Sequence, residues 1–166
     1  IAYLEATLEI AGQLTAMGGD EVKVYIASGA SQGGLLMGAK ALALPWQVTG
    51  VVWADASESN IDVVRWANGA ADYLGLPLSI TWDEVDRTTD YVGEGYGVPG
   101  PDCIEAIRMM AELEGIILDP IYTGKVLAAV IDHARRGVLT PEDTVLFVHT
   151  GGLPEVFGYA DILKRS

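Results

Sequence analysis

The stretch "VYIASGASQGGLLMGAKAL", residues 24–42, joins two kinds of local pattern. Its first residues, Val24 to Ala27, form an apolar run typical of a buried strand, and the residues from Gly33 onward have the spacing of a helix. Between them lies a turn of small residues, 28–34, which places an almost side-chain-free backbone at the start of a helix. A strand that leads through such a turn into a helix is the repeating unit of a parallel α/β sheet.

The small-residue turn has two readings. Free N–H groups at a helix start, the positive end of the helix dipole and the hydroxyls of Ser28 and Ser31 all favour binding of a phosphate. Gly and Ser are also common in strand-to-helix turns that bind nothing. The turn is not a P-loop, since no Gly-Lys-Ser/Thr follows it, and it does not match the dinucleotide fingerprint. On this stretch alone, both readings stay open.

Strand and helix patterns alternate along the rest of the chain. Helices are expected over residues 3–17, 33–44, 58–74, 102–114 (with Asp102 as the cap), 122–136 and 154–163. Strands are expected over residues 22–27, 48–54, 78–82, 116–118 and 144–148, and a polar Gly/Pro-rich loop over residues 87–101. The alternation predicts an α/β fold of three layers, with a mostly parallel sheet and helices on both faces. No repeat or linker is visible, so residues 1–166 are expected to form a single domain.

Composition limits the partners of the chain. Its 166 residues, half of them hydrophobic, suffice for one core, and no apolar run is long enough to span a bilayer. The lack of a basic leader and the single Cys103 favour a soluble protein of the reducing cytoplasm. A net charge of −13 disfavours nucleic acids and anionic membranes as partners, so an anionic ligand must be held by local dipoles.

Loops after the predicted strands hold further candidate residues, because ligands of such sheets bind beyond the carboxyl ends of the strands. Tyr96 lies among three glycines in residues 93–97, and Tyr122 lies in "DPIYTGK". A tyrosine on such a backbone has its hydroxyl free to act, although each one alone is also explained by surface packing. His133 and His149 are interpreted as structural. The Asp and Glu residues show no ligand spacing, so no metal is predicted.

Four segments together resemble one enzyme family. "SGASQGG" (28–34), "GYGVP" (95–99), "EAIRMMAELEGIILDPIYTGK" (105–125) and "HTGG" (149–152) stand in the order and spacing of the carboxyl-terminal half of the D-cysteine desulfhydrase / 1-aminocyclopropane-1-carboxylate deaminase family. These are pyridoxal-phosphate enzymes of the tryptophan-synthase-β fold. The resemblance covers essentially the whole chain. It implies the incomplete large domain of that fold, pyridoxal 5'-phosphate as cofactor, a small amino-acid substrate and a homo-oligomer, expected to be a dimer.

The resemblance also assigns roles to residues of this chain. It gives the cofactor phosphate to the small-residue turn, namely Ser28, Gly29, Ala30, Ser31 and Gln32. It places Thr123 and Thr150 beside the nitrogen of the cofactor ring. It places Tyr96 and Tyr122 near the substrate carboxylate and Cα, where a phenol can relay a proton or bind a developing charge.

One departure from the family is large. Family members are about twice as long, and the absent amino-terminal half carries the lysine that bonds to the cofactor and a serine-asparagine pair that binds the substrate. Lys23, Lys40, Lys125 and Lys164 do not stand in the motif of that lysine, although Lys125 is close to Tyr122. The chain also begins at Ile1 within an expected helix. We therefore expect a fragment, a processed product or one half of a split enzyme, inactive without the missing half.

Two positions bear on the reaction. Ring-opening deaminases of the family have a glutamate after the tyrosine of "DPxY" and an aliphatic residue in "HTGG", whereas this chain has Thr123 and Thr150. A hydroxyl at the ring nitrogen gives a shallower electron sink than a carboxylate, which suffices for a good leaving group such as sulfide. The expected reaction is β-elimination from D-cysteine or a similar amino acid to pyruvate, ammonia and sulfide. The short phosphate loop and the ending "GYADILKRS" favour the alternative, a 1-aminocyclopropane-1-carboxylate deaminase; a further β-eliminating relative and a non-catalytic fragment stay open.

Overall fold

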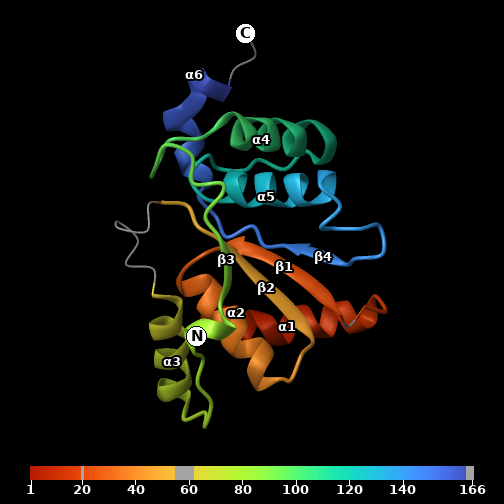
Figure 1. Cartoon of the computed structure of the whole chain (residues 1–166), viewed down its shortest axis with the longest axis vertical. Helices are drawn as coiled ribbons and strands as arrows, with labels where there is room; N and C mark the ends of the chain where they lie inside the picture. The colour runs from red at the N-terminus through yellow and green to blue at the C-terminus, as the bar shows by residue number, and fades with distance from the viewer. Residues whose placement is uncertain (20, 55–61, 164–166) are drawn as a thin grey trace.

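A parallel β-sheet forms the middle layer of the computed structural model, which describes residues 1–19, 21–54 and 62–163 (Figure 1). The strands are β1 (Val22–Ala27), β2 (Trp46–Val51), β3 (Asp86–Thr88) and β4 (Val145–Phe147). They lie in the order β3-β2-β1-β4, and all three strand pairs are parallel. In this register Val24 of β1 lies beside Val48 of β2 and Leu146 of β4.

Helices cover both faces of the sheet, which confirms the predicted three-layer α/β class (Figure 1). One face carries α1 (Ala2–Ala16), α2 (Ala30–Ala41) and α3 (Val63–Leu74), and the other carries α4 (Pro101–Glu114), α5 (Thr123–Arg135) and α6 (Ala160–Leu163). On this second face α5 lies against the sheet and α4 lies on α5. Within the described residues no helix is long and apolar enough to cross a membrane.

Alternation along β1 explains why the sheet is buried on both faces. Val24 and Ile26 pack into a core with α1 and α2, whereas Tyr25 and Ala27 pack into a second core with α4 and α5. All four of these side chains are at least 95% buried. Continuous apolar strands of this kind are typical of parallel sheets covered on both sides.

Glycines of the opening stretch let the helices of the first layer approach closely. A Cβ on Gly34 would lie 2.7 Å from the Cβ of Tyr3, and a Cβ on Gly38 would lie 2.3 Å from the hydroxyl of Thr7, both on α1. A Cβ on Gly33 would lie 2.7 Å from a backbone oxygen of α3. These glycines therefore allow α2 to pack closely between α1 and α3.

Two predicted strands are wrong within the described residues. Residues 116–118 form no strand, and residues 78–82 are held by a side chain instead, because the Asn68 amide accepts from the N–H of Ile80 and donates to its carbonyl. The strand that extends the sheet is β3, at the edge of the segment predicted to be a loop. The sequence pattern could not show that residues 86–88, and not residues 78–82, form the edge strand. The position of residues 78–82 depends on the contact of Ile80 with Asn68 of α3, which lies earlier in the chain.

Several boundaries also differ from prediction. Helix α2 begins at Ala30, so part of the predicted turn is already helical, and β2 lies at Trp46–Val51 and not at 48–54. Helix α4 has Gly100 at its N-cap, which places Asp102 inside the first turn. The predicted helix over 154–163 is a 3-10 helix at Leu153–Tyr159 followed by α6. Helix α3 begins at Val63, and predicted helical residues 58–61 lie outside the described residues.

Candidate functional site

The candidate site lies where the chain changes direction across the sheet. From β1 the chain builds β2 and β3 on one side, whereas β4 pairs with the other side of β1, and ligands of such sheets bind at this switch point. Residues 28–31 follow β1 and residues 150–152 follow β4, and both line a cavity of about 450 Å³. This volume is typical of small-molecule sites. The rest of the wall is formed by Tyr3, Ala27, Trp53, Trp66 and Tyr122.

The first wall of the cavity is the start of α2. Gly29 is the N-cap residue, with φ 139° and ψ −144°, a backbone conformation that favours glycine. Gly29 has no side chain to cap the helix, so within the described residues the N–H groups of its first turn have no side-chain cap. The Ser31 hydroxyl donates to the carbonyl of Ala27 at 3.1 Å. An uncapped helix start in a cavity wall favours the phosphate reading of this turn over a plain turn.

Gln32 contributes differently from the other residues of the turn. Its side chain is fully buried, accepts a hydrogen bond from Ser28 at 2.9 Å and donates to the carbonyl of Asp86 at 2.7 Å. A Cβ on Gly50 would lie 2.0 Å from the Gln32 amide oxygen. The Gln32 side chain thus connects α2 to β2 and β3 and does not line the cavity, so only its backbone N–H, in the first turn of α2, stays available to a phosphate.

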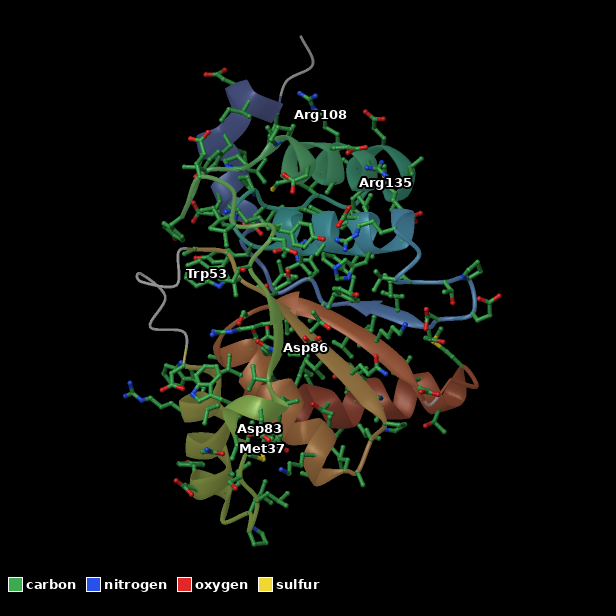
Figure 2. All side chains as sticks on the ribbon, viewed as in Figure 1. Met37, Trp53, Asp83, Asp86, Arg108 and Arg135 are labelled. Carbon is green, nitrogen blue, oxygen red and sulfur yellow. The ribbon has the colours of Figure 1, made fainter. Side chains whose placement is uncertain are left out.

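The two predicted tyrosines meet beside this cavity. The hydroxyl oxygens of Tyr96 and Tyr122 lie 3.1 Å apart, although the two residues come from different loops. Trp53, which lies beyond the end of β2 (Figure 2), contacts both rings edge-on at centroid distances of 5.4 and 5.0 Å. The Trp53 indole also donates to the carbonyl of Ser28 at 2.8 Å. Trp53 therefore joins the tyrosine pair to the turn after β1, a role that no sequence signal indicated.

The environment of Tyr122 determines its protonation. Burial, and then the hydrogen bond with Tyr96, raises the pKa of Tyr122 well above its ordinary value. Its phenol consequently stays protonated at neutral pH. In this state Tyr122 can donate a hydrogen bond or pass on a proton, and it is not a free base.

Asp119 holds Tyr122 in place. Its fully buried carboxylate accepts hydrogen bonds from the N–H groups of Ile121, Tyr122 and Thr123 at 2.8, 2.7 and 2.8 Å. It therefore binds the orphan donors at the start of α5. A Cβ on Gly152 would lie 2.4 Å from the Asp119 carboxyl carbon, so the loop after β4 packs on the same group. An Asp shortly before a predicted helix is a capping signal that could have revealed this residue.

The two threonines predicted beside the ring nitrogen occupy different places. Thr150 lines the cavity. Thr123 is fully buried outside the cavity wall, and its hydroxyl donates to Asp119 at 2.6 Å and accepts from the Asp119 N–H at 2.9 Å. None of the described residues that line the cavity carries a charged side chain.

The described lysines lie away from the cavity wall. The Lys125 amine donates to the carbonyls of Trp53, Val92 and Gly95, at 3.1, 2.6 and 3.0 Å. Lys23 forms an ion pair with Asp143, and Lys40 forms one with Glu84. Lys164 lies outside the described residues.

The remaining candidates have structural partners. His133 shares a 2.7 Å hydrogen bond with the hydroxyl of Tyr25, and His149 shares one of 3.0 Å with the carbonyl of Ile117. Cys103 is buried, which raises the pKa of its thiol to about 12. The parts of the chain that the structure describes contain no group of three or more His, Cys, Asp and Glu residues suited to a metal ion.

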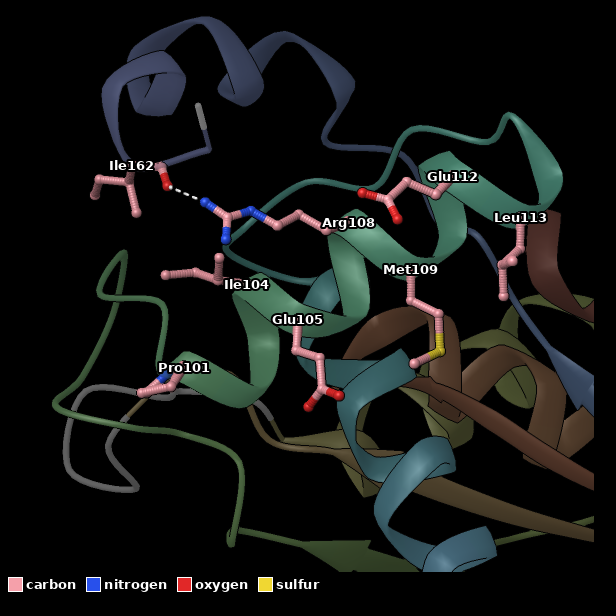
Figure 3. Close-up of a pocket in the computed structure, with 8 residues that line it drawn as sticks. All are labelled: Pro101, Ile104, Glu105, Arg108, Met109, Glu112, Leu113 and Ile162. Carbon is pink, nitrogen blue, oxygen red and sulfur yellow. Dashed lines mark hydrogen bonds between the residues drawn. The ribbon is translucent and has the colours of Figure 1, made fainter. Parts of the chain in front are cut away.

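A larger hollow of about 750 Å³ runs along α4 (Figure 3). Arg108 lies in it and donates to the carbonyl of Ile162 at 3.3 Å. Its other lining residues are Pro101, Ile104, Glu105, Met109, Glu112 and Leu113. None of the predicted site residues lines this hollow.

Comparison with known proteins identifies the family. Residues 2–151 match the family described as "Pyridoxal-phosphate dependent enzyme". The chain belongs to this family. This pyridoxal-phosphate family member is 36% identical over 148 residues to a 1-aminocyclopropane-1-carboxylate deaminase of Burkholderia ambifaria, a match that covers 89% of the chain and 44% of the relative.

Solved structures show the same fold. A crystal structure of an ACC deaminase homologue matches with a TM-score of 0.78 and 31% identity, over 97% of this family member and 48% of that chain. A fungal L-serine ammonia-lyase from Rhizomucor miehei matches with a TM-score of 0.55 and 16% identity. The match covers 98% of this chain and 56% of the lyase chain. The latter likeness concerns the fold alone. The chain thus spans about half the length of its relatives.

The cavity fits the family cofactor in part. The uncapped start of α2, with Gly29 in a conformation that favours glycine, suits a phosphate group. Thr150 and four aromatic residues, Tyr3, Trp53, Trp66 and Tyr122, provide a wall for a flat ring. An amine to bond with the cofactor is not among the described residues that line the cavity.

Proposed function

We propose that this chain is the phosphate-binding half of a pyridoxal-phosphate enzyme that catalyses β-elimination from D-cysteine or a similar small amino acid. With water, the reaction yields pyruvate, ammonia and sulfide. The observation that carries the proposal is the cavity itself, which is lined by the uncapped start of α2 and by Tyr122, whose hydroxyl shares a hydrogen bond with that of Tyr96. The cofactor, when bound, supplies the electron sink for the electron pair left at Cα.

The residues of this chain would divide the work as follows. The N–H groups at the start of α2 and the Ser31 region would bind the phosphate, as the dipole of the helix favours. Thr150 would contact the ring of the cofactor, since it lines the same cavity as the start of α2. Tyr122, protonated because its pKa is raised, would donate a hydrogen bond or a proton near the substrate, and Tyr96 would hold that hydroxyl in place.

The uncharged cavity wall supports elimination of sulfide. A carboxylate beside the ring nitrogen would keep that nitrogen protonated, whereas the described wall offers the Thr150 hydroxyl and no carboxylate. Thr123 donates its hydroxyl to Asp119 and does not line the cavity. Of the two threonines predicted beside the ring nitrogen, only Thr150 lies in this wall. A shallower electron sink is sufficient for a good leaving group and poorer for opening a carbon ring.

A second candidate is ring opening of 1-aminocyclopropane-1-carboxylate. It is favoured by the Burkholderia ambifaria relative, whose name records this deaminase activity. The two candidates predict different products, pyruvate from D-cysteine and 2-oxobutyrate from the cyclopropane. Both need a partner segment with the lysine, which we propose comes from the part of the family that this chain does not match, in an assembly that is a homo-oligomer of complete units.

The test is reconstitution. The chain is co-expressed with the part of the ACC deaminase homologue that it does not match, and the purified assembly is assayed with D-cysteine and with the cyclopropane substrate. We expect cofactor in the assembly and pyruvate as the main product. A main product of 2-oxobutyrate would support the second candidate. An assembly that forms but binds no cofactor, together with an isolated chain that binds no phosphate, would overturn both.

A further inference from the structure

The loop that carries Tyr96 has few contacts of its own that fix its backbone conformation. Gly93, Gly95 and Gly97 have φ values of +69°, +141° and +72°, and a single bridge joins Gly95 to Val98. Glycines in such conformations lose more backbone freedom on folding than other residues. Tyr96 is half exposed, so burial of its ring is a weak anchor. Contacts from elsewhere in the chain must therefore hold this loop against Tyr122.

Lys125 makes two of these contacts with the loop, and the Tyr159 hydroxyl makes another by donating to the carbonyl of Gly97 at 2.6 Å. Lys125 lies in the first turn of α5, and none of its side chain is exposed. Its amine donates to the carbonyls of Val92 and Gly95 within the loop and to the carbonyl of Trp53 beyond β2. A lysine ammonium has three N–H donors and no acceptor, so these three carbonyls use its whole hydrogen-bonding capacity.

The three segments that meet at this ammonium are the ones that form the tyrosine pair. Tyr96 directly follows Gly95, Trp53 contacts both tyrosine rings, and Tyr122 is the N-cap residue of the helix that carries Lys125. Burial lowers the pKa of Lys125, as expected for a charge taken out of water. Three carbonyl oxygens at hydrogen-bonding distance compensate for this loss of hydration.

We propose that Lys125 is the positioning residue of the tyrosine pair, and that its buried ammonium holds residues 92–98 so that the Tyr96 hydroxyl meets that of Tyr122. The importance of this positioning for catalysis rests on the proposed function, whereas the hydrogen bonds of Lys125 do not depend on it. Lys125 does not replace the lysine that bonds to the cofactor in the family, because all three of its N–H groups already donate to carbonyls.

The test compares Lys125→Met with Lys40→Met. Lys40 is a matched control, since its amine also donates to a backbone carbonyl, that of Ser79, but from an exposed position. In Lys125→Met, amide hydrogen exchange over residues 92–98 should accelerate at least tenfold while β1 stays protected, because hydrogen bonds from a charged donor are lost. In ¹³C-tyrosine NMR, the Tyr122 pKa should move back toward its ordinary value, because the hydrogen bond with Tyr96 helps to raise it. Lys40→Met should change neither.

Wild-type protein provides a second measurement, for the case in which Lys125→Met does not fold. The ammonium protons of Lys125 should give a ¹H–¹⁵N signal that exchanges slowly with water, unlike those of Lys23 and Lys40. An unprotected Lys125 signal, or unchanged exchange over residues 92–98 in a folded Lys125→Met, overturns the proposal. Neither readout needs cofactor or substrate, so failure of the positioning role and failure of the proposed function are separate results.

Discussion

Gly152 packs directly on the carboxyl group of Asp119, so closely that a Cβ on the glycine would lie 2.4 Å from the carboxyl carbon. Gly152 belongs to the loop after β4, and Asp119 belongs to the segment that precedes α5. Asp119 also fixes the backbone of Tyr122. Asp119 and Gly152 thus connect two segments that both line the cavity, the one that carries Tyr122 and the one that carries Thr150.

Gly152→Ala should therefore destabilise the chain and distort the cavity. The residue has φ +81°, and the new methyl group would meet the Asp119 side chain, so we expect a loss of about 2–4 kcal/mol in the free energy of unfolding. Chemical denaturation measures it. Gly158→Ala is the control, because a Cβ on Gly158 would have no atom of the described residues within 4 Å. Equal stability of the two variants would contradict the contact.

Ser31→Asp should abolish binding of inorganic phosphate by the isolated chain. The new carboxylate would occupy the start of α2, where the helix N–H groups would meet the ligand. Ser31→Ala should weaken binding by about tenfold or less, since the wild-type hydroxyl also donates to Ala27. Calorimetry gives both affinities. Ser79→Asp adds the same charge at an exposed position outside the cavity wall, and an equal effect there would indicate general repulsion by the acidic chain.

Stability should fall at alkaline pH, partly because of Tyr122. A folded-state pKa raised above the unfolded value of 10.0 means that the folded chain holds the proton more tightly. This contribution is complete below about pH 10 and is lost as pH rises through the folded pKa. Urea denaturation from pH 8 to 11 should show a shallower decline for Tyr122→Phe than for wild type. Tyr73→Phe, at a site 78% exposed, should follow wild type. Identical slopes for all three proteins would refute this protonation effect.

Thr123 and Thr150 should respond to mutation in different ways. Thr123→Val removes two hydrogen bonds with Asp119 and should cost about 1–3 kcal/mol of stability. In the reconstituted assembly, Thr150→Val should leave stability nearly unchanged and reduce pyruvate release from D-cysteine relative to 2-oxobutyrate release from the cyclopropane. The two product assays and a thermal melt separate these effects. A selectivity change in Thr123→Val without loss of stability would reverse the assignment.

Borohydride reduction of the isolated chain with pyridoxal phosphate should leave no stoichiometric label on a single lysine. The Lys125 amine is buried and donates to three carbonyls, while Lys23 and Lys40 lie in ion pairs outside the cavity wall. Peptide mass spectrometry after reduction measures the occupancy of each site. A single label at full occupancy, above all on Lys125, would show that this chain carries its own cofactor lysine.

The amino-acid sequence by itself determined the fold class and the strand that anchors it. The predicted strand 22–27 has the bounds of β1, because a segment rich in β-branched and aromatic residues is a local signal for a strand, and both cores bury its side chains. The predicted end of α4 at Gly115 is also observed, with φ +68°, since a glycine that ends a helix needs no distant partner. The loops with Tyr96 and Tyr122 were likewise visible as patterns, although their catalytic role stays a prediction.

Only the tertiary structure decided which polar groups face the cavity. The short segment near Ile80 is paired with Asn68 and not with a strand, and Thr123 is hydrogen-bonded to Asp119. The buried Gln32 side chain donates to the carbonyl of Asp86. These outcomes depend on partners brought together by packing, and a buried polar group takes whichever partner satisfies it. The local sequence does not show which partner is chosen. For the same reason the role of Lys125 could not be predicted, since its three carbonyl partners lie 30 to 72 residues away along the chain.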